Sequence, residues 1–508
     1  MNQIDHDVQP TTPPLRVRRL GLHTQDAVLA LMRTDCHVCR AEGLAPRAQV
    51  LITAATRQIQ ATLFQTEGDF LAPGEVGLSE AAWKLLDVEE GDRARISHPP
   101  ALESLSSVRR RIYGNRLDAK SFEAIVNDVV RGRYTDVHLA AFLTASSAMP
   151  LDEDETLHLT RAMVAAGDRL DWKMPIVVDK HSIGGLPGNR TTPIVVAIVT
   201  ALGLVMPKTS SRAITSPAGT ADTMETLTPV DLDLTTLRRV VEAEGGCLAW
   251  GGAVRLSPAD DIFIRIERVL DVDTEGQLIA SVLSKKIAAG STHVVIDIPV
   301  GATAKVRTED AGKSLGERLV KVAGKFGLSA VCLQSEGIQP VGRGVGPALE
   351  AHDVLAVLQG APGAPADLRH NACTLAGAAL EIGEIAKPGE GYAAANAALE
   401  DGRAWRKFQR ICIAQGGLRV PPKAAHVRPL RASRAGRVVH MNNRKISRLA
   451  KLAGAPDAKA AGLRVEVRLG DEVFADQPLL MVHAETPGEL AYAFDYAERN
   501  VDIIQVES

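Results

Sequence analysis

Aromatic side chains are scarce in this chain, and neither sign of charge dominates it. Phe, Trp and Tyr make up 4% of the residues, and 58 Lys and Arg stand against 61 Asp and Glu, for a net charge of −3. Proteins that bind single-stranded nucleic acid stack bases on aromatic rings, and binding to nucleic acid or to an anionic membrane calls for a basic surface. We therefore expect no nucleic-acid partner and no membrane partner.

Cysteines and long apolar runs are also few. Six cysteines in 508 residues do not make a disulfide scaffold. The most apolar stretch, residues 194–206, is shorter than the ~20 residues of a membrane-spanning helix. Residues 1–25 are polar and lack the apolar core of a secretory signal. A reduced, cytoplasmic location is the expectation that fits these features.

The hydrophobic pattern predicts a multidomain α/β protein. Short β-like runs precede residue 100, residues 121–166 carry apolar side chains at helical spacing, and a strand–loop–helix alternation typical of a parallel sheet begins at residues 175–178. The expected parts are a small β-rich N-terminal module (1–95), the first part of a helical domain (96–170) and the first part of a mostly parallel α/β domain (171–255). They are followed by a helical segment (256–290), the second part of the α/β domain (291–420) and an α+β C-terminal module (421–508).

The densest polar cluster follows the strand expected at residues 175–178. It reads DKHSIGGLPGNRTT (residues 179–192) and leads into an apolar, helix-like run. Glycines allow the backbone to approach a ligand, N–H groups at a helix start favour an anion, and Lys180 supplies a full positive charge. Ser182, Thr191 and Thr192 add hydroxyl donors. The loop predicts a phosphate site; the alternative is a Gly/Pro-rich connector with a solvated lysine.

A second polar loop follows the next strand-like segment, at residues 205–208. It reads KTSSRAITSPAGTAD (residues 208–222) and carries both cations and hydroxyls. Because the carboxyl ends of parallel strands meet at one edge of a sheet, the two loops are expected to converge on one oxyanion. The pair of loops makes a stronger prediction of an anion site than either loop alone.

Three other motifs are expected to carry no ligand chemistry. GKS (312–314) is similar to the end of a Walker A loop, but residue 307 is Arg rather than Gly and the motif lies in a helical pattern. GRGVG (342–346) follows no strand in the phase of a dinucleotide fingerprint, so a tight turn is expected. Cys36 and Cys39 have metal-like spacing, but every other cysteine is isolated, so ordinary thiols and no metal are expected.

Taken together, the two loops resemble those of the thymidine and pyrimidine-nucleoside phosphorylase family, and the resemblance runs from about residue 100 to the C-terminus. The supporting segments are DKHS (179–182), SVLSKK (281–286), DIPVG (297–301) and GPALEA (346–351). The family implies a nucleoside phosphorylase/phosphoribosyltransferase-like fold. It also implies phosphorolysis, in which inorganic phosphate converts thymidine to thymine and 2-deoxyribose 1-phosphate. Phosphate would be the co-substrate with no cofactor, and a homodimer or a higher homo-oligomer is expected.

The resemblance also assigns roles to particular residues. It implies that phosphate is held by Lys180, Ser182, Thr191, Thr192, Ser210 and Thr220. It implies that the base faces His181, Ser281, Lys285 and an arginine, either Arg265 or Arg268. Lys180 and His181 are accordingly candidate catalytic residues.

The sequence SSRAITSPAGT (210–220) and the extra N-terminal module are similar to the long-form (type 2) branch, which includes AMP phosphorylases. That branch implies cleavage of AMP to adenine and ribose 1,5-bisphosphate, with Asp273 as proton donor, because a purine leaves most easily once N7 is protonated. Asp273 would need a pKa raised by burial or by Asp271; the alternative is a solvated or helix-capping side chain. The implied nucleotide contacts are Gly185, Ser211, Arg212, Ala213, Ile214, Thr215, Ser216, Thr220, Ser281 and Lys305.

Two further functions remain open from the sequence. A phosphoribosyltransferase of the related fold would be expected to use a metal–pyrophosphate site with paired acids, for which Asp260 and Asp261 are the nearby candidates. A non-catalytic nucleotide-binding regulator would tolerate the loss of Lys180, whereas an enzyme would not.

Overall fold

The computed structural model describes residues 13–25, 27–213, 216–272 and 274–507. The chain divides into two compact units, which are described separately: residues 1–107 with 128–138, and residues 108–127 with 139–508. In the described ranges, no helix has the length and apolar character needed to cross a membrane.

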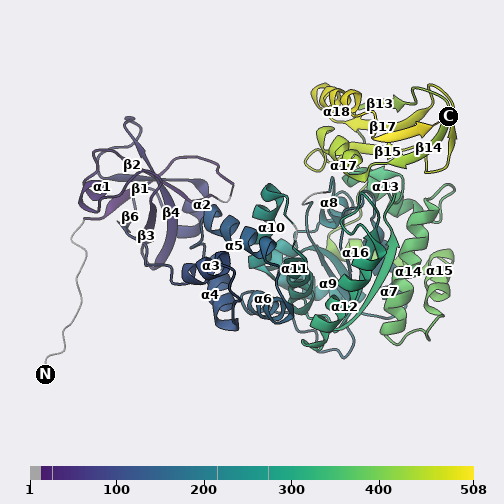
Figure 1. Cartoon of the computed structure of the whole chain (residues 1–508), viewed down its shortest axis with the longest axis horizontal. Helices are drawn as coiled ribbons and strands as arrows, with labels where there is room; N and C mark the ends of the chain where they lie inside the picture. Colours follow the sequence, from purple (N-terminus) through teal and green to yellow (C-terminus); the bar gives the residue numbers. More distant parts are fainter. Residues whose placement is uncertain (1–12, 26, 214–215, 273, 508) are drawn as a thin grey trace. The chain divides into compact units, whose positions relative to one another are not determined.

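The first unit is built around a closed six-stranded barrel (Figure 1). In β3, Val50, Ile52 and Ala54 are buried and alternate with half-buried positions, because successive side chains of a strand point to opposite faces. The short helices α1 (His37–Ala41) and α2 (Glu80–Leu86) lie between strands. The β-rich N-terminal module is therefore confirmed. In barrel order the strands are β1 (Leu15–Arg19), β5 (Glu75–Leu78), β2 (Leu29–Arg33), β4 (Arg57–Thr66), β3 (Gln49–Ala54) and β6 (Arg93–Ser97).

Helices from two distant stretches of sequence make the helical part. The first stretch gives α3 (Leu105–Ile112), α4 (Ala119–Val130), α5 (Asp136–Ala148) and α6 (Glu153–Ala165), and the second gives α10 (Pro258–Leu270) and α11 (Glu275–Ala288). Helix α11 packs against α6. A buried ion cluster ties the first stretch together: Glu155 accepts from Arg111 at 2.7 Å and from Arg116 at 2.5 Å.

The α/β part contains two parallel sheets. One has the order β11-β10-β7, and the other pairs β8 with β9. A backbone hydrogen bond from Val178 to Val205 at 2.9 Å brings the start of β7 beside the segment that leads into β8. Strand β10 is buried along most of its length, as expected of a parallel strand covered on both faces. The strands are β7 (Val178–Ser182), β8 (Met206–Ser210), β9 (Gly246–Trp250), β10 (His293–Val300) and β11 (Ser329–Glu336).

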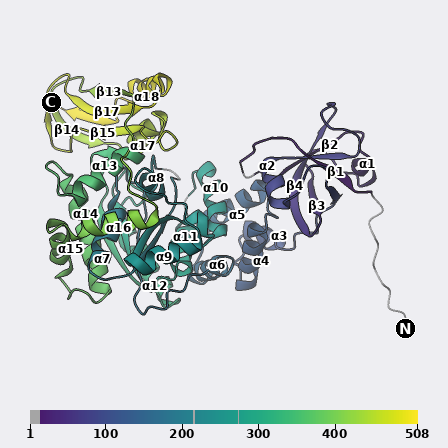
Figure 2. The ribbon, with the colours of Figure 1, turned by 180° about the vertical axis from the view of Figure 1, so that it is seen from behind.

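Helices cover these sheets. Helix α7 is apolar on every side and buried along nearly all its length, because it packs against both α14 and α16. Helices α14 and α15 lie side by side in both views (Figures 1 and 2). The GKS motif lies inside α12, as expected. The helices of this part are α7 (Thr191–Ala201), α8 (Thr220–Glu225), α9 (Leu234–Glu244), α12 (Glu309–Gly324), α13 (Pro347–Leu358), α14 (Ala366–Ile382), α15 (Gly391–Glu400) and α16 (Arg403–Gln415).

Two strands of the α/β part begin later than predicted. The prediction of a strand at residues 175–178 is wrong in position, since β7 starts at Val178 and includes Asp179 and Lys180. The strand predicted at residues 205–208 likewise extends through Ser210. These side chains suggested a loop, but Asp179 and Lys208 form an ion pair and Lys180 donates to Thr191 on α7, so all three are buried within strands.

The C-terminal module is α+β, as predicted. Its strands form a four-stranded sheet of order β12-β15-β17-β13 and a three-stranded sheet of order β16-β14-β18, packed with two helices around a shared apolar core. The tight turn expected at residues 342–346 is wrong in part, because residues 344 and 345 pair with β15. The elements are β12 (Gly344–Val345), β13 (His426–Arg431), β14 (Gly436–Met441), α17 (Asn443–Leu452), β15 (Gly462–Val465), β16 (Glu472–Val473), β17 (Pro478–Ala484), α18 (Pro487–Arg499) and β18 (Ile504–Glu507).

Candidate functional site

Arg190 joins the two polar loops. It lies at the end of the first loop, directly before α7, and its side chain reaches the second loop. Its Nη1 donates to Thr220 Oγ1 at 2.9 Å and its Nη2 donates to the Ala218 carbonyl at 2.8 Å. Arg190 therefore brings the two loops together although β7 and β8 belong to separate sheets, and the convergence of the loops on one oxyanion stays a prediction.

Lys180 is a buried cation whose partner is a hydroxyl group. It is 1% exposed, and its Nζ donates to Thr191 Oγ1 at 2.9 Å, in the first turn of α7. Burial lowers the pKa of Lys180 to about 8, against the opposing pull of the Asp297 carboxylate. Among the residues that the structure describes, none forms a carboxylate ion pair with Lys180. Its charge can therefore be directed to an anionic ligand.

A second group of buried charges lies behind Lys180. Asp179 accepts from Lys208 at 3.0 Å and from Lys286 at 2.7 Å, and all three side chains are at most 5% exposed. Burial, together with repulsion between the two ammonium groups, lowers the pKa of Lys286. Lys180, in contrast, has no carboxylate ion pair among the described residues, and a buried cation of this kind favours the binding of an anion.

Ser182, at the end of β7, is held by a carboxylate on the neighbouring strand. Ser182 Oγ donates to Asp297 Oδ2 at 2.8 Å, and the two residues are paired in the β7–β10 register. The same carboxylate accepts from Asn189 at 3.2 Å and from Ser335 at 2.5 Å. Asp297 thus fixes the first loop to the sheet.

The second loop starts with a hydroxyl that has no partner in the described part of the chain. Ser210 Oγ is buried and makes no hydrogen bond there. Further along, Asp222 accepts from the backbone N–H of Ala213 at 2.6 Å and of Gly219 at 2.9 Å. A Cβ on Gly219 would lie 2.5 Å from the Ser211 carbonyl, so only glycine permits this closure of the loop.

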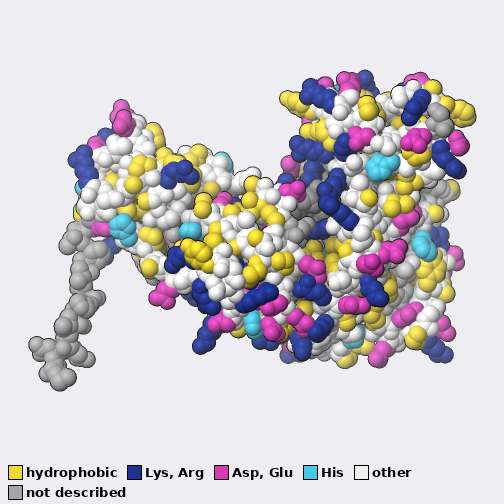
Figure 3. Space-filling model, viewed as in Figure 1, with side chains coloured by type: hydrophobic (Ala, Val, Ile, Leu, Met, Phe, Trp, Pro, Cys, Tyr) yellow, Lys and Arg dark blue, Asp and Glu magenta, His cyan; other side chains and the backbone are white. Residues whose placement is uncertain are grey.

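Arg212 is engaged by protein groups. It pairs with Glu225 at 2.8 Å and with Asp222 at 3.3 Å, and its guanidinium lies 4.9 Å from the centroid of the Trp250 ring. Arg212 and Lys459 together lower the pKa of Glu225 to about 2. Lys459 belongs to the C-terminal module, and Lys and Arg side chains gather on the face over α17 of that module (Figure 3).

The residues expected at the base form a second group. Lys285 Nζ donates to Asp260 Oδ2 at 2.6 Å and to Ser281 Oγ at 3.1 Å. His181 lies on β7, and burial together with the surrounding lysines holds its pKa well below the ordinary value, so its ring is neutral at pH 7. Asp261 keeps solvent contact, but surrounding protein atoms and the Asp260 carboxylate raise its pKa to about 6.

The remaining predicted residues are scattered. A Cβ on Gly185 would lie 2.8 Å from the Lys305 backbone nitrogen, so these two predicted nucleotide contacts adjoin each other. Thr192 is buried in α7, Ser211 is exposed, and Ser216 Oγ donates to the Ala218 carbonyl at 2.8 Å. Arg265 and Arg268 are exposed on α10, and burial together with the nearby Arg268 lowers the pKa of Lys451 on α17. The predictions for Ile214, Thr215 and Asp273 lie outside the described residues.

Four buried carboxylates hold predicted site residues in place, a role that the sequence did not predict for any of them, although it offered Asp260 as a candidate metal ligand. Asp297, Glu350, Asp260 and Asp222 accept hydrogen bonds from predicted site residues or from Arg190, and each is at most 2% exposed. Asp297 and Glu350 lie in segments that carry the family resemblance, and an acidic residue inside an apolar run was the signal that could have identified Asp297.

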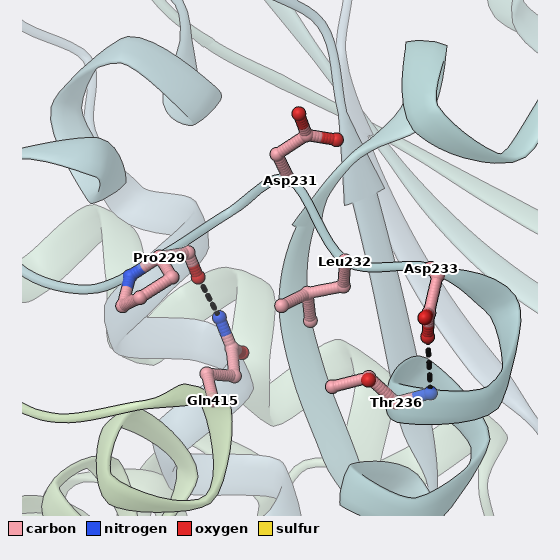
Figure 4. A pocket seen from close by; sticks show the side chains of 6 residues that line it. All are labelled: Pro229, Asp231, Leu232, Asp233, Thr236 and Gln415. Carbon is pink, nitrogen blue, oxygen red and sulfur yellow. Dashed lines mark hydrogen bonds between the residues drawn. The ribbon is translucent and has the colours of Figure 1, made fainter.

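Two cavities lie away from the predicted site residues. A cavity of about 470 Å³ lies between the loop before α9 and the end of α16, where Gln415 Nε2 donates to the Pro229 carbonyl at 2.8 Å while Asp231 points away (Figure 4). A second cavity, of about 400 Å³, reaches Ser335, which bonds to Asp297. Neither is lined by a predicted site residue.

In the barrel, Cys36 and Cys39 are buried, and a hydrogen bond from the Cys39 thiol lowers the pKa of Cys36 to about 6.

Comparison with known proteins agrees with this architecture. Residues 106–167 match the helical bundle domain of a glycosyl transferase family, and residues 174–405 match the a/b domain of that family. Proteins named "Putative thymidine phosphorylase" are 72% identical in Chelativorans sp. (strain BNC1) and 64% identical in Tolumonas auensis. Both alignments cover 98% of this chain, with 98% and 99% of the relatives.

Solved structures share the fold at low identity. Anthranilate phosphoribosyltransferase from Thermus thermophilus superposes with a TM-score of 0.51 and 19% identity, over 61% of this chain and 99% of that chain. The Saccharomyces cerevisiae enzyme, solved with PRPP and Mg, gives a TM-score of 0.51 and 14% identity, over 62% and 98%. Such identities bear on the fold alone, and the predicted fold class is confirmed. With the family domains and the full-length relatives, these findings establish that the chain belongs to the thymidine and pyrimidine-nucleoside phosphorylase family and is a pentosyltransferase.

Proposed function

We propose that this enzyme cleaves the N-glycosidic bond of thymidine with inorganic phosphate, giving thymine and 2-deoxyribose 1-phosphate. The observation that carries the proposal is Lys180, a buried ammonium with a hydroxyl rather than a carboxylate as its partner. A buried cation left without a counter-charge is costly, and a bound dianion would supply that charge. The names of the full-length relatives support the choice of thymidine.

In this proposal the two loops hold phosphate. Lys180 supplies charge, and the hydroxyls of Thr191 or Thr192, Ser210 and Thr220 supply directed donors. The Ser182 hydroxyl donates to Asp297 and would join them by turning its proton to phosphate. Ser210 is a good candidate because its buried oxygen has no partner within the described ranges. Positioned donors lower the barrier by holding the nucleophile below the anomeric carbon, where positive charge develops as the bond breaks.

The leaving base would face the group of Lys285, Ser281 and His181. A departing pyrimidine carries negative charge on its O2/N3 edge, which Lys285 and Ser281 would stabilise. Asp260 holds the Lys285 ammonium at 2.6 Å and so fixes its direction. His181 is neutral at pH 7, so it would serve as a hydrogen-bonding group rather than as a charge.

AMP is a second candidate substrate, cleaved to adenine and ribose 1,5-bisphosphate. The observation that favours it is the close approach of Gly185 and Lys305, which are 120 residues apart in the sequence and which the resemblance to the long-form branch implies as nucleotide contacts. Asp273 would protonate N7 of the purine in this reaction. A phosphoribosyltransferase is less well supported, because Asp260, half of the acid pair that a metal would need, is already bound to Lys285.

The test is phosphate-dependent release of free base from thymidine, uridine, cytidine, adenosine, AMP and CMP, followed by chromatography. Release from thymidine supports the proposal, and release from monophosphates alone replaces it with the AMP reaction. Asp273→Asn provides a second readout, because it is expected to abolish AMP cleavage and to spare thymidine cleavage. No phosphate-dependent release from any substrate would refute phosphorolysis.

A further inference from the structure

We infer that Arg190, held by Glu350, is a positioning residue that fixes the Thr220 hydroxyl as a hydrogen-bond donor to phosphate. The inference rests on the phosphate site of the proposed function and adds two residues to it. Neither residue was among the ligands that the sequence predicted.

Arg190 ties three segments together with one side chain. Its side chain is 11% exposed, and its Nε donates to Glu350 Oε2 on α13 at 2.6 Å. The two Nη atoms reach the Thr220 hydroxyl and the Ala218 carbonyl of the second loop. Because the guanidinium is a rigid planar fork, its orientation toward Glu350 determines where the Nη donors point.

Glu350 is in turn held rigidly. It is 1% exposed and lies in the first turn of α13. Its Oε2 also accepts from Thr223 Oγ1 at 3.1 Å, and its Oε1 accepts from the Gly346 backbone N–H at 3.2 Å. Thr223 lies on α8, the helix that begins at Thr220. One carboxylate therefore orders both Arg190 and the helix that carries Thr220.

The contact with Arg190 sets the direction of the Thr220 proton. A hydroxyl group has one donor and two acceptor sites. Because Thr220 Oγ1 accepts from a cation, its own O–H points elsewhere, and the withdrawal of electron density makes that O–H a stronger donor. A phosphate oxygen is the acceptor that suits this arrangement.

The contrasting account is that Arg190 and Glu350 only stabilise the fold. A positioning residue acts on phosphate through Thr220, so its substitution and that of Thr220 should have non-additive effects on phosphate affinity. The effects of a purely structural residue should be additive with those of Thr220. A double-mutant cycle on phosphate affinity separates them.

The experiment measures the Kd of inorganic phosphate by calorimetry on the full-length chain. The variants are Thr220→Val, Arg190→Met/Glu350→Gln, and the triple variant, in which no buried charge loses its partner. We expect Thr220→Val and the double variant each to weaken binding about tenfold, as loss of a charge-assisted hydrogen bond does. The triple variant is expected to bind phosphate about as weakly as the double variant, whereas independent effects would weaken binding about a hundredfold.

Controls address stability. Arg111→Met/Glu155→Gln removes another buried Arg–Glu pair, 2.7 Å long, from the helical part, and it should lower the Tm without changing the phosphate Kd. If Arg190→Met/Glu350→Gln does not fold, Arg190→Lys takes its place in the cycle. The lysine keeps the charge beside Glu350 but lacks the fork that reaches Thr220.

The outcomes are distinct. Additive losses, or an unchanged Kd in the Arg190 variants, overturn the inference. Base release by the unaltered enzyme, assayed in parallel, tests the proposed function: coupled phosphate binding without base release sustains the inference and overturns phosphorolysis. An unaltered protein that binds no phosphate overturns both.

Discussion

Lys180 and Lys286 are both buried in the same part of the molecule, and they differ in their partners. Lys286 is 2% exposed and donates to the Asp179 carboxylate at 2.7 Å. Lys180 is 1% exposed and donates to the Thr191 hydroxyl at 2.9 Å. A carboxylate neutralises a buried ammonium, whereas a hydroxyl orients it and leaves the charge in place.

The contrast separates structural charge from functional charge. The group of Asp179, Lys208 and Lys286 holds strands and helices together, so altering it should chiefly change stability. Lys180 should chiefly affect the reaction, because its removal leaves no carboxylate without a partner. Four changes test this contrast, in order of decreasing effect.

The largest effect is expected from Lys180→Met. The variant removes the main positive charge of the phosphate site, and we expect kcat/KM for phosphorolysis to fall about a thousandfold, as loss of a strong electrostatic contact does. The Tm should stay within a few degrees of the unaltered enzyme, since a buried charge is replaced by an apolar chain of similar length. Near-normal kinetics would remove Lys180 from the phosphate site.

Asp179→Asn should act on stability instead. It leaves two ammonium groups buried side by side, and we expect a loss of about 3 kcal/mol in the free energy of unfolding, measured with urea. Asp87→Asn serves as the matched control, because Asp87 pairs with Arg57 at an exposed position of the barrel and should contribute almost nothing. Equal losses in both variants would contradict the assignment of a structural charge group.

The pH dependence of the KM for phosphate tests whether the charge of Lys180, rather than the size of its side chain, holds phosphate. The pKa of Lys180 is lowered to about 8, so its proton is lost as the pH rises through that value, and the KM for phosphate should then rise up to tenfold per pH unit. Since the unfolded chain still binds this proton, stability should rise with pH between about 8 and the ordinary lysine pKa of about 10.4. Lys180→Arg, which stays charged, should flatten the KM profile, and a profile identical to that of the unaltered enzyme would count against the role of the Lys180 charge.

The smallest effect is expected from Lys459→Met. Lys459 also has carboxylate partners, Glu225 at 2.9 Å and Asp222 at 3.7 Å, but it is about one-third exposed. Arg212 remains paired with the same carboxylates, so the loss of stability should stay below about 1 kcal/mol. A loss as large as that of Asp179→Asn would show that burial is not what separates the two cases.

The sequence was sufficient to predict the fold class, because long periodic segments and turn residues are local signals. The boundaries of β7 and β8 were misplaced because burial of Asp179 and Lys208 depends on an ion-paired group that includes Lys286, more than 100 positions from Asp179. Periodicity within a window cannot report such distant neutralisation.

The candidate site was predictable where it is written as a motif. Glycines, lysines and hydroxyls in two loops indicated an anion, and the structure joins those loops through Arg190. An acidic residue in an apolar run marked Asp297, but the residues that Asp297 and Glu350 hold were not predictable, because each accepts a hydrogen bond from a residue more than 100 positions away in the chain. Their role follows only from the tertiary contacts.

The most direct test of the central claim is a ³¹P NMR spectrum of the reaction mixture, recorded beside the assay of free base. The account predicts one new sugar phosphate ester for each molecule of base released by the unaltered enzyme, and almost none from Lys180→Met. Base released without a matching ester, or an equal yield of ester from Lys180→Met, would contradict it.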